Sequence, residues 1–149
     1  MRLVIQRVKS TSVNVRGKVV GSIKKGIFVL VGVEKDDTEK DAEKLAEKLS
    51  KLRVMADKKG KMNLSINDVA GKILIVSQFT LHADTTQGNR PSFLKSAFPR
   101  DAERIYKHFI EYLKNLGLRV ETGKFGAYMK INLELDGPVT ILLDSKSKL

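Results

Sequence analysis

The sequence predicts an α+β fold: antiparallel-leaning, barrel-like β-sheets with two amphipathic helices on the outside, in a single domain over residues 1–149. Most of the chain consists of short runs rich in β-branched residues, which favour strands. Only the stretches 36–52 and 99–117 repeat apolar residues at helical spacing. With 42% hydrophobic and 30% charged residues, the chain is typical of one folded domain, and no linker, low-complexity segment or internal repeat divides it.

The first part of the chain reads as a series of strands. β-branched residues recur through 2–8, 11–15 and 18–23, and Arg-Gly at 16–17 supplies a turn before the third run. The run "GIFVLVGV" at 26–33 is apolar at both odd and even positions. We therefore expect a strand that is covered on both faces.

A helix follows, because the spacing of the apolar residues changes. Asp37 or Thr38 can cap its first turn, and Glu and Lys residues, with Glu47 and Lys51 four residues apart, cover its outer face. The apolar residues at helical spacing are Ala42, Leu45, Ala46, Leu49 and Leu52. The tetrapeptide "DKKG" then predicts a turn at 57–60.

The second half repeats the order of strand, loop and helix. "KILIVSQFTL" predicts a strand at 72–81, and a polar loop follows at 82–92. A second amphipathic helix starts after Pro99 and is closed by Gly117. The chain is expected to finish as strands at 118–122, 127–135 and 139–144.

The stretch "LDGPVT" at 135–140 interrupts the last of these strands. Glycine weakens a strand interior, and proline cannot donate a hydrogen bond to a neighbouring strand. The simplest interpretation is a turn that joins two strands.

Composition narrows the classes of function. The chain has no cysteine, which excludes disulfides and thiolate chemistry. Its first ten residues lack the apolar core of a signal peptide, and its longest apolar run is far shorter than the ~20 residues of a membrane helix, so we expect a cytoplasmic protein with no membrane partner. The net charge of +11 favours nucleic acid as a partner over the alternative, a charged surface that serves heat stability.

Catalytic candidates gather where the expected strand at 72–81 changes from apolar to polar. "VSQFTLHAD" places Ser77, Gln78 and Thr80 at the strand end, with His82 just beyond. A nucleophile–base–acid triad of Thr80, His82 and Asp84 is disfavoured, because one strand cannot bring the imidazole onto the hydroxyl. Backbone N–H groups freed at a strand end offer an oxyanion hole instead. The sequence has neither the residue spacing of a metal site nor the glycine pattern of a nucleotide cofactor, so we expect no metal and no cofactor.

Six motifs follow one another along nearly the whole chain: "IQRV", "GKMNLS", "VSQFTL", "GNRPSF", "TGKFGAYM" and "DGPVT". Together they resemble the D-aminoacyl-tRNA deacylases. The resemblance implies an α+β homodimer that hydrolyses the ester between a D-amino acid and tRNA. One position departs from the family: Leu135 stands where asparagine is usual, which leaves the hydrogen bonding of the following turn open.

The resemblance also implies roles for individual residues. The family's active-site strand is matched by Ser77, Gln78, Phe79 and Thr80. There, backbone N–H groups near Gln78 and Phe79 are expected to hold the ester carbonyl. Phe125 and Met129 match the pocket for the terminal adenosine, although core packing is the alternative that their own chemistry favours. Arg90 to Ser92 match a loop beside the site, to which we assign no role.

Gly137 and Pro138 match the family's filter for chirality. The resemblance implies a cis peptide bond between them, with Arg7 and Thr140 supporting the motif. It also implies that the two carbonyls of the turn point across a dimer interface at the active-site strand of the partner. An L side chain would collide with these carbonyls, whereas a D side chain avoids them. Glycine has no side chain, so we expect glycyl-tRNA to be cleaved as well.

Two mechanisms remain open from the sequence. Thr80 can attack the ester as a nucleophile, but no base is evident beside it. The alternative, which the resemblance favours, is that the protein positions and polarises the ester while the 2′-hydroxyl of the terminal adenosine assists a water molecule.

Two other functions compete with D-aminoacyl-tRNA hydrolysis. The first is a non-catalytic basic RNA-binding module, which needs a row of exposed aromatic residues. The second is an editing domain that removes a miscognate L-amino acid from tRNA. Under each of these readings the expected partner is aminoacyl-tRNA or RNA, and not DNA.

Overall fold

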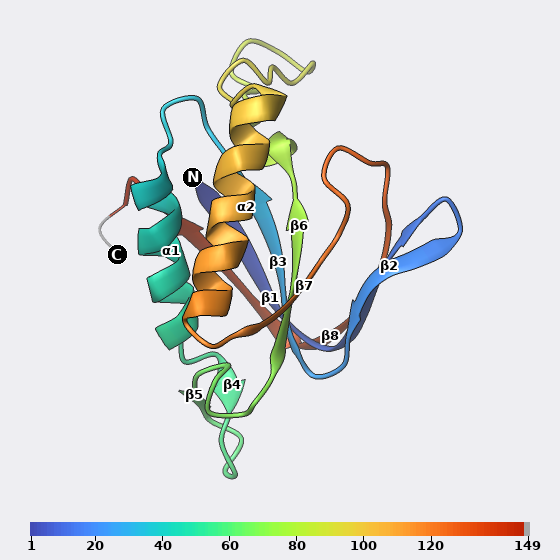
Figure 1. Ribbon diagram of the computed structural model, residues 1–149, viewed down its shortest axis with the longest axis vertical. Coiled ribbons are helices and arrows are strands. Elements are labelled where there is room, and N and C mark those ends of the chain that lie inside the picture. The colour runs from blue at the N-terminus through green and yellow to red at the C-terminus, as the bar shows by residue number, and fades with distance from the viewer. Residues whose placement is uncertain (148–149) are drawn as a thin grey trace.

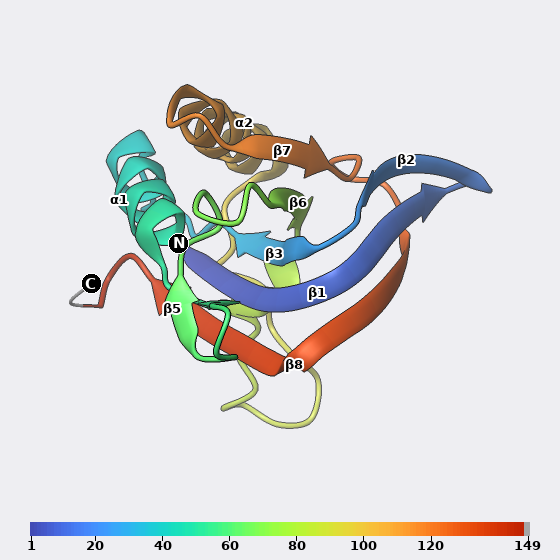
Figure 2. The same cartoon turned by 90° about the horizontal axis from the view of Figure 1, so that it is seen from below.

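The computed structural model describes residues 1–147 and contains a curved sheet, two helices and a small hairpin. α1 (Glu39–Lys51) and α2 (Pro99–Asn115) lie side by side on one face of the sheet (Figure 1). Seen from below, the sheet curls until it is nearly closed (Figure 2). The predicted α+β fold, with a barrel-like sheet and two outer helices, is confirmed.

The sheet consists of β1 (Arg2–Val15), β2 (Lys18–Ile23), β3 (Gly26–Gly32), β6 (Lys72–Ser77), β7 (Arg119–Thr122) and β8 (Lys130–Asp144), while β4 (Met55–Ala56) and β5 (Met62–Leu64) form the hairpin around the expected turn. β1 pairs antiparallel with β2, β3 and β8, whereas β3–β6 and β6–β7 are parallel. Parallel neighbours need a long crossover connection. The two crossovers contain α1 and α2, which explains where the helices lie.

β1 and β8 each join two segments that the sequence predicts as separate strands. β1 runs through 2–8 and 11–15 without a break, and β8 runs from Lys130 through both of the last expected strands. The two strands pair with each other along nearly their whole length. This long-range partner keeps both of them extended where the local sequence suggests an interruption.

The stretch "LDGPVT" is therefore a bulge within β8 and not a turn between two strands. Gln6 pairs with Thr140 and Val8 pairs with Leu135, so residues 136–139 lie opposite the single residue Arg7. A bulge disrupts the hydrogen-bond ladder locally. The backbone groups of 136–139 are consequently not paired with β1 and can contact another molecule.

The core lies on both faces of the central strands. The face towards the helices buries alternate residues of β1, β3 and β6, namely Leu3, Ile5, Ile27, Val29, Ile73 and Ile75. The opposite face buries a smaller cluster inside the curl of the sheet, consisting of Val8, Val13, Ile23, Phe28, Leu74 and Val76. β3 contributes to both clusters, which confirms that it is a strand covered on both faces.

β6 ends at Ser77 and not at residue 81 as the sequence predicts. The N–H of Gln78 still donates to the carbonyl of Val31 at 2.7 Å. The neighbouring β3 then ends at Gly32, and without a partner the chain turns into the short 3₁₀ helix η1 (Phe79–His82).

The helices begin and end close to where the sequence places them. Thr38 caps α1, and its backbone N–H and hydroxyl donate to the Asp41 carboxylate at 2.8 and 2.7 Å. Gly117 follows α2 with a φ of +82°, a conformation that glycine adopts readily. Among residues 1–147, no helix has the length and apolar character to cross a membrane.

Candidate active site

The segment Ser77–Thr80 lies at the end of β6, where the strand gives way to η1. Its first backbone donor is already used, because the N–H of Gln78 binds Val31. This N–H therefore has its partner within the chain, and the expectation that backbone N–H groups near Gln78 and Phe79 hold an ester carbonyl stays a prediction. Phe79 and Thr80 open η1, and the first N–H groups of a helical turn have no partner within it. These two groups are the backbone donors that the segment can offer to a ligand.

Among residues 1–147, no base forms a hydrogen bond with the hydroxyl of Thr80. Instead, the Gln78 side-chain amide donates to the Thr80 Oγ1 at 2.6 Å. His82 is only 2% exposed, and neither of its ring nitrogens has a hydrogen-bond partner within residues 1–147. Hydrogen bonds from Lys95 and Thr86 hold the pKa of Asp84 well below its usual range, which makes this carboxylate a weak base. Thr80 and His82 therefore form no hydrogen bond with each other among residues 1–147.

The loop after η1 supports the candidate segment. Asp84 and Ser92 pair through two backbone hydrogen bonds of 2.8 Å, which closes the loop on itself. Phe93 packs edge-on against Phe79, with 5.1 Å between the ring centroids, and the Ser96 hydroxyl donates to the Phe79 carbonyl at 3.1 Å. Sequence reasoning missed both contacts, although Phe93 belongs to the motif "GNRPSF". Arg90 to Ser92 thus lead into residues that hold the segment in place.

The peptide bond Gly137–Pro138 is cis, as expected. Gly137 has a φ of +145°, and a Cβ atom there would lie 2.6 Å from the backbone nitrogen of Val139. Only glycine fits this position. Beyond the bulge, the Gln6 amide donates to the Thr140 hydroxyl at 3.4 Å, so Thr140 helps to return β8 to its pairing with β1.

Arg7 anchors the bulge from the inside. Its side chain is 11% exposed, and its Nε donates to the Asp136 carbonyl at 3.0 Å and lies 3.1 Å from the Asp136 carboxylate. Its terminal nitrogen donates to the Val54 carbonyl at 2.9 Å. Asp136 therefore holds the bulge to Arg7, although the sequence analysis gave it no role. It is the neighbour of Leu135, the apolar residue that departs from the family.

One chain does not bring the two regions together. The bulge lies opposite Arg7, which pairs with Ile27 of β3, and Ile27 pairs with Ile73 of β6. Ser77 lies further along β6 and three strands away from β8. At ~3.3 Å per residue and ~4.8 Å between strands, the separation is about 13 Å along the sheet and about 14 Å across it.

Phe125 and Met129 are both half-buried. Phe125 packs on Tyr106 with 5.7 Å between ring centroids, and it also lines an open pocket of about 730 Å³. Met129 packs against the smaller core cluster and does not line that pocket. The pocket also includes Tyr128, which is 86% exposed, and the cations Arg16, Lys124 and Lys130.

The described part of the chain contains no group of three or more His, Cys, Asp or Glu side chains that could hold a metal ion. The second histidine, His108, connects the two helices: its Nε2 on α2 lies 2.9 Å from a carboxylate oxygen of Glu43 on α1. The segment Ser77–Thr80 itself contains backbone donors, the Gln78 amide and the Thr80 hydroxyl.

The chain resembles known proteins over nearly its full length. The family model described as D-Tyr-tRNA(Tyr) deacylase matches residues 4–144. The chain is 58% identical to a D-aminoacyl-tRNA deacylase of Thermosipho melanesiensis, covering 98% of both chains, and 56% identical to one of Thermotoga petrophila, covering 97% of both.

Two solved structures share the fold. The c-Myc DNA Unwinding Element Binding Protein superposes with a TM-score of 0.92 at 41% identity, covering 99% of this chain and 100% of that one. A probable eukaryotic D-amino acid tRNA deacylase superposes with a TM-score of 0.83 at 17% identity, covering 95% and 97%, a likeness that concerns the fold alone. The full-length family match and relatives above 50% identity lead to one conclusion: the chain belongs to the D-Tyr-tRNA(Tyr) deacylase family.

Proposed function

We propose that this protein is a cytoplasmic hydrolase that cleaves the ester bond of D-aminoacyl-tRNA and releases the D-amino acid and the tRNA. The family match over residues 4–144 carries this proposal. The segment Ser77–Thr80 supports it, because it presents backbone donors and an amide–hydroxyl pair at an exposed strand end. The proposed macromolecular partner is aminoacyl-tRNA and not DNA.

The chemistry follows from what the segment contains. The N–H groups of Phe79 and Thr80 polarise the ester carbonyl and stabilise the negative charge that develops on its oxygen. Because no base contacts Thr80, the 2′-hydroxyl of the terminal adenosine assists the attacking water. The water oxygen bonds to the carbonyl carbon, the bond from that carbon to the ribose 3′-oxygen breaks, and the proton that the water loses passes by way of the 2′-hydroxyl to the leaving 3′-oxygen. Orientation can suffice, since positioning alone lowers a barrier substantially.

The terminal adenosine is proposed to bind beside Phe125, which lines the open pocket of about 730 Å³. Met129 supports it from the core side. An aromatic ring can stack on the face of any nucleobase.

The chiral filter requires a second copy of the chain. Gly137–Pro138 is proposed to reach the Ser77–Thr80 segment of the partner subunit, because the two regions lie apart within one chain. Exposed apolar side chains support such a homodimer: Leu142 of β8 is 74% exposed, and Leu135 and Phe79 are exposed as well. The backbone carbonyls of the bulge then reject L side chains by collision. Glycine passes the filter.

The test is a comparison of matched D- and L-aminoacyl-tRNA as substrates. We expect release of the D-amino acid and persistence of the L-ester, measured as the fraction of aminoacylated tRNA over time. Binding of tRNA without turnover would indicate a non-catalytic RNA-binding module. Preferential turnover of the L-ester would indicate an editing domain for a miscognate L-amino acid.

A further inference from the structure

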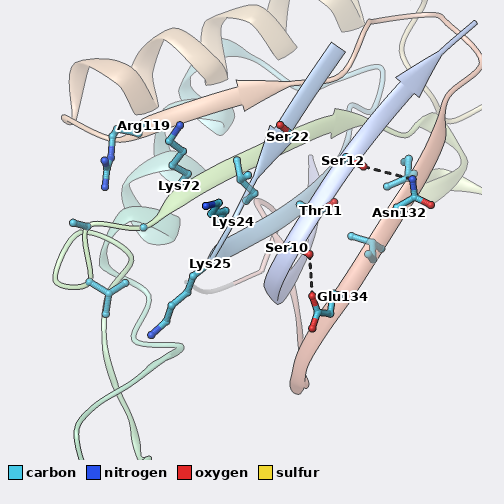
Figure 3. A pocket seen from close by; sticks show the side chains of 16 residues that line it. Ser10, Thr11, Ser12, Ser22, Lys24, Lys25, Lys72, Arg119, Asn132 and Glu134 are labelled. Carbon is cyan, nitrogen blue, oxygen red and sulfur yellow. Dashed lines mark hydrogen bonds between the residues drawn. The ribbon is translucent and has the colours of Figure 1, made fainter. Parts of the chain in front are cut away.

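Figure 3 shows a second open pocket, of about 1000 Å³. It lies at the opposite end of β6 from the candidate active site. It is lined by the middle of β1, the turn between β2 and β3, the loop before β6, the start of β7 and the first half of β8. Lys72 begins β6 and Ser77 ends it. At ~3.3 Å per residue, the pocket is therefore about 17 Å from the candidate active site.

Cations from three separate segments meet around this pocket. Its lining includes four of them, namely Lys24, Lys25, Lys72 and Arg119, and a single carboxylate, Glu134. Lys72 lies 3.7 Å from Glu121 in an exposed ion pair. Lys24, Lys25 and Arg119 form no ion pair with any residue of 1–147. Their charge is thus uncompensated by the protein.

Hydroxyl groups accompany the cations. Ser10, Ser12 and Ser22 line the pocket, and the Ser10 hydroxyl donates to Glu134 at 3.0 Å. Thr11 also lines it and is only 4% exposed, and its Oγ1 has no hydrogen-bond partner within the described chain. A buried hydroxyl without a partner costs free energy. The described chain thus leaves one hydroxyl at this pocket without a hydrogen-bond partner.

We propose that this pocket binds the phosphodiester backbone of tRNA, away from the ester that is hydrolysed. The inference rests on the proposed function. Lysine, arginine and hydroxyl groups are the usual partners of phosphate oxygens. None of the residues that line the pocket is aromatic, so it lacks a platform for bases, unlike the pocket beside Phe125 and Tyr128. The pocket therefore contacts the RNA without reading its bases, and it contributes affinity for tRNA in general.

The first experiment measures the affinity of uncharged tRNA over a range of salt concentrations. The variant is K24A/K25A, and its matched control is K58A/K59A, which removes the same two charges from another exposed turn. We expect K24A/K25A to raise the Kd about tenfold and to lower the slope of log Kd against log salt by about 1.5, as loss of two phosphate contacts requires. The control should change the Kd less than twofold. Equal effects of both variants, or no effect of K24A/K25A, would overturn the proposal.

A second variant tests the orphaned hydroxyl. T11V keeps the shape of the side chain and removes the hydroxyl. We expect the unfolding midpoint to stay unchanged or to rise, because an unsatisfied buried group is lost, while the Kd for tRNA rises about threefold. A lower midpoint with an unchanged Kd would mean that the hydroxyl serves the protein alone.

Two further measurements separate this inference from its alternatives. With D-aminoacyl-tRNA as substrate, K24A/K25A should raise KM about tenfold at unchanged kcat. An active wild type whose KM is unaffected by K24A/K25A refutes the docking pocket and leaves the proposed function standing. An inactive wild type whose tRNA affinity still depends on K24A/K25A refutes the proposed function alone. Saturable binding of inorganic phosphate, together with unchanged tRNA affinity in K24A/K25A, would assign the pocket to a small anion and overturn the proposal.

Discussion

The segment Ser77–Thr80 lies where β6 runs out of a partner strand, whereas the Gly137–Pro138 bulge lies in the middle of the longest strand of the sheet. The first is exposed and is held from outside by a loop, through Phe93 and Ser96. The second is held from inside by the mostly buried guanidinium of Arg7. At the strand end, backbone donors become free because pairing stops, whereas the bulge, which is proposed to exclude L side chains, is fixed by paired residues on both sides.

Because of this difference, we expect substitutions in the two regions to change different properties of the protein. Changes at the strand end should alter the rate, because they act on the groups that are proposed to contact the ester. Changes behind the bulge should alter stability and selectivity together, because the anchor of the bulge is also part of the core contact between β1 and β8. The following experiments test this separation.

The largest effect should come from the substrate and not from the protein. Replacing the terminal 2′-hydroxyl of D-aminoacyl-tRNA by hydrogen should lower kcat about 10²–10⁴-fold, the usual contribution of a group that assists proton transfer. Single-turnover kinetics with the two substrates measure this ratio, and the Kd of the modified tRNA serves as the control. A ratio near one would show that the protein itself activates the water.

Removal of the anchor should be the next largest change. Arg7→Ala leaves Asp136 and the Val54 carbonyl without their partner, so we expect a loss of about 2–3 kcal/mol in the free energy of unfolding. Arg104→Ala breaks an exposed ion pair with Glu39 and should cost about 1 kcal/mol or less. Urea unfolding of both variants gives the comparison.

The same anchor should govern selectivity. Because the bulge loses its fixed position, we expect hydrolysis of L-aminoacyl-tRNA relative to the D-form to rise at least about tenfold in Arg7→Lys, which keeps the charge but not the forked geometry. This variant remains informative if Arg7→Ala does not fold. Unchanged selectivity in a folded Arg7→Lys protein would argue against the bulge as the filter.

Thr80→Ala should have a smaller effect on the rate. The Thr80 hydroxyl accepts a hydrogen bond from Gln78 and has no base beside it, so we expect kcat to fall less than about tenfold. Thr85→Ala, an exposed position in the following loop, is the matched control. Complete loss of turnover with tRNA binding retained would establish Thr80 as the nucleophile.

The smallest difference is expected between glycine and a D-amino acid. A filter that works only by collision cannot reject a residue without a side chain. Glycyl-tRNA should therefore be hydrolysed within about threefold of the rate of D-alanyl-tRNA, while L-alanyl-tRNA persists. Resistance of glycyl-tRNA would mean that the site makes favourable contacts with a D side chain.

Local patterns in the sequence were sufficient to predict many of the structural elements of this molecule. Helical spacing located α1 and α2, apolar residues of both parities identified β3 as covered on both faces, and Arg-Gly at 16–17 marked the first turn. The ordered motifs pointed to the family and to the cis bond at Gly137–Pro138. The helices, β3 and the first turn depend on residues close together in the chain, so composition and spacing were enough to predict them, whereas the cis bond was predicted from the family resemblance.

Tertiary structure alone decided the rest. β8 stays a single strand through Gly137–Pro138 because β1, far away in sequence, pairs with it on both sides of the bulge. β6 stops at Ser77 because its neighbour β3 ends at Gly32, and Arg7 finds Asp136 and Val54 only once the sheet has curled. Each of these outcomes depends on which distant segment supplies the hydrogen-bond partner, and no local pattern of residues encodes that choice.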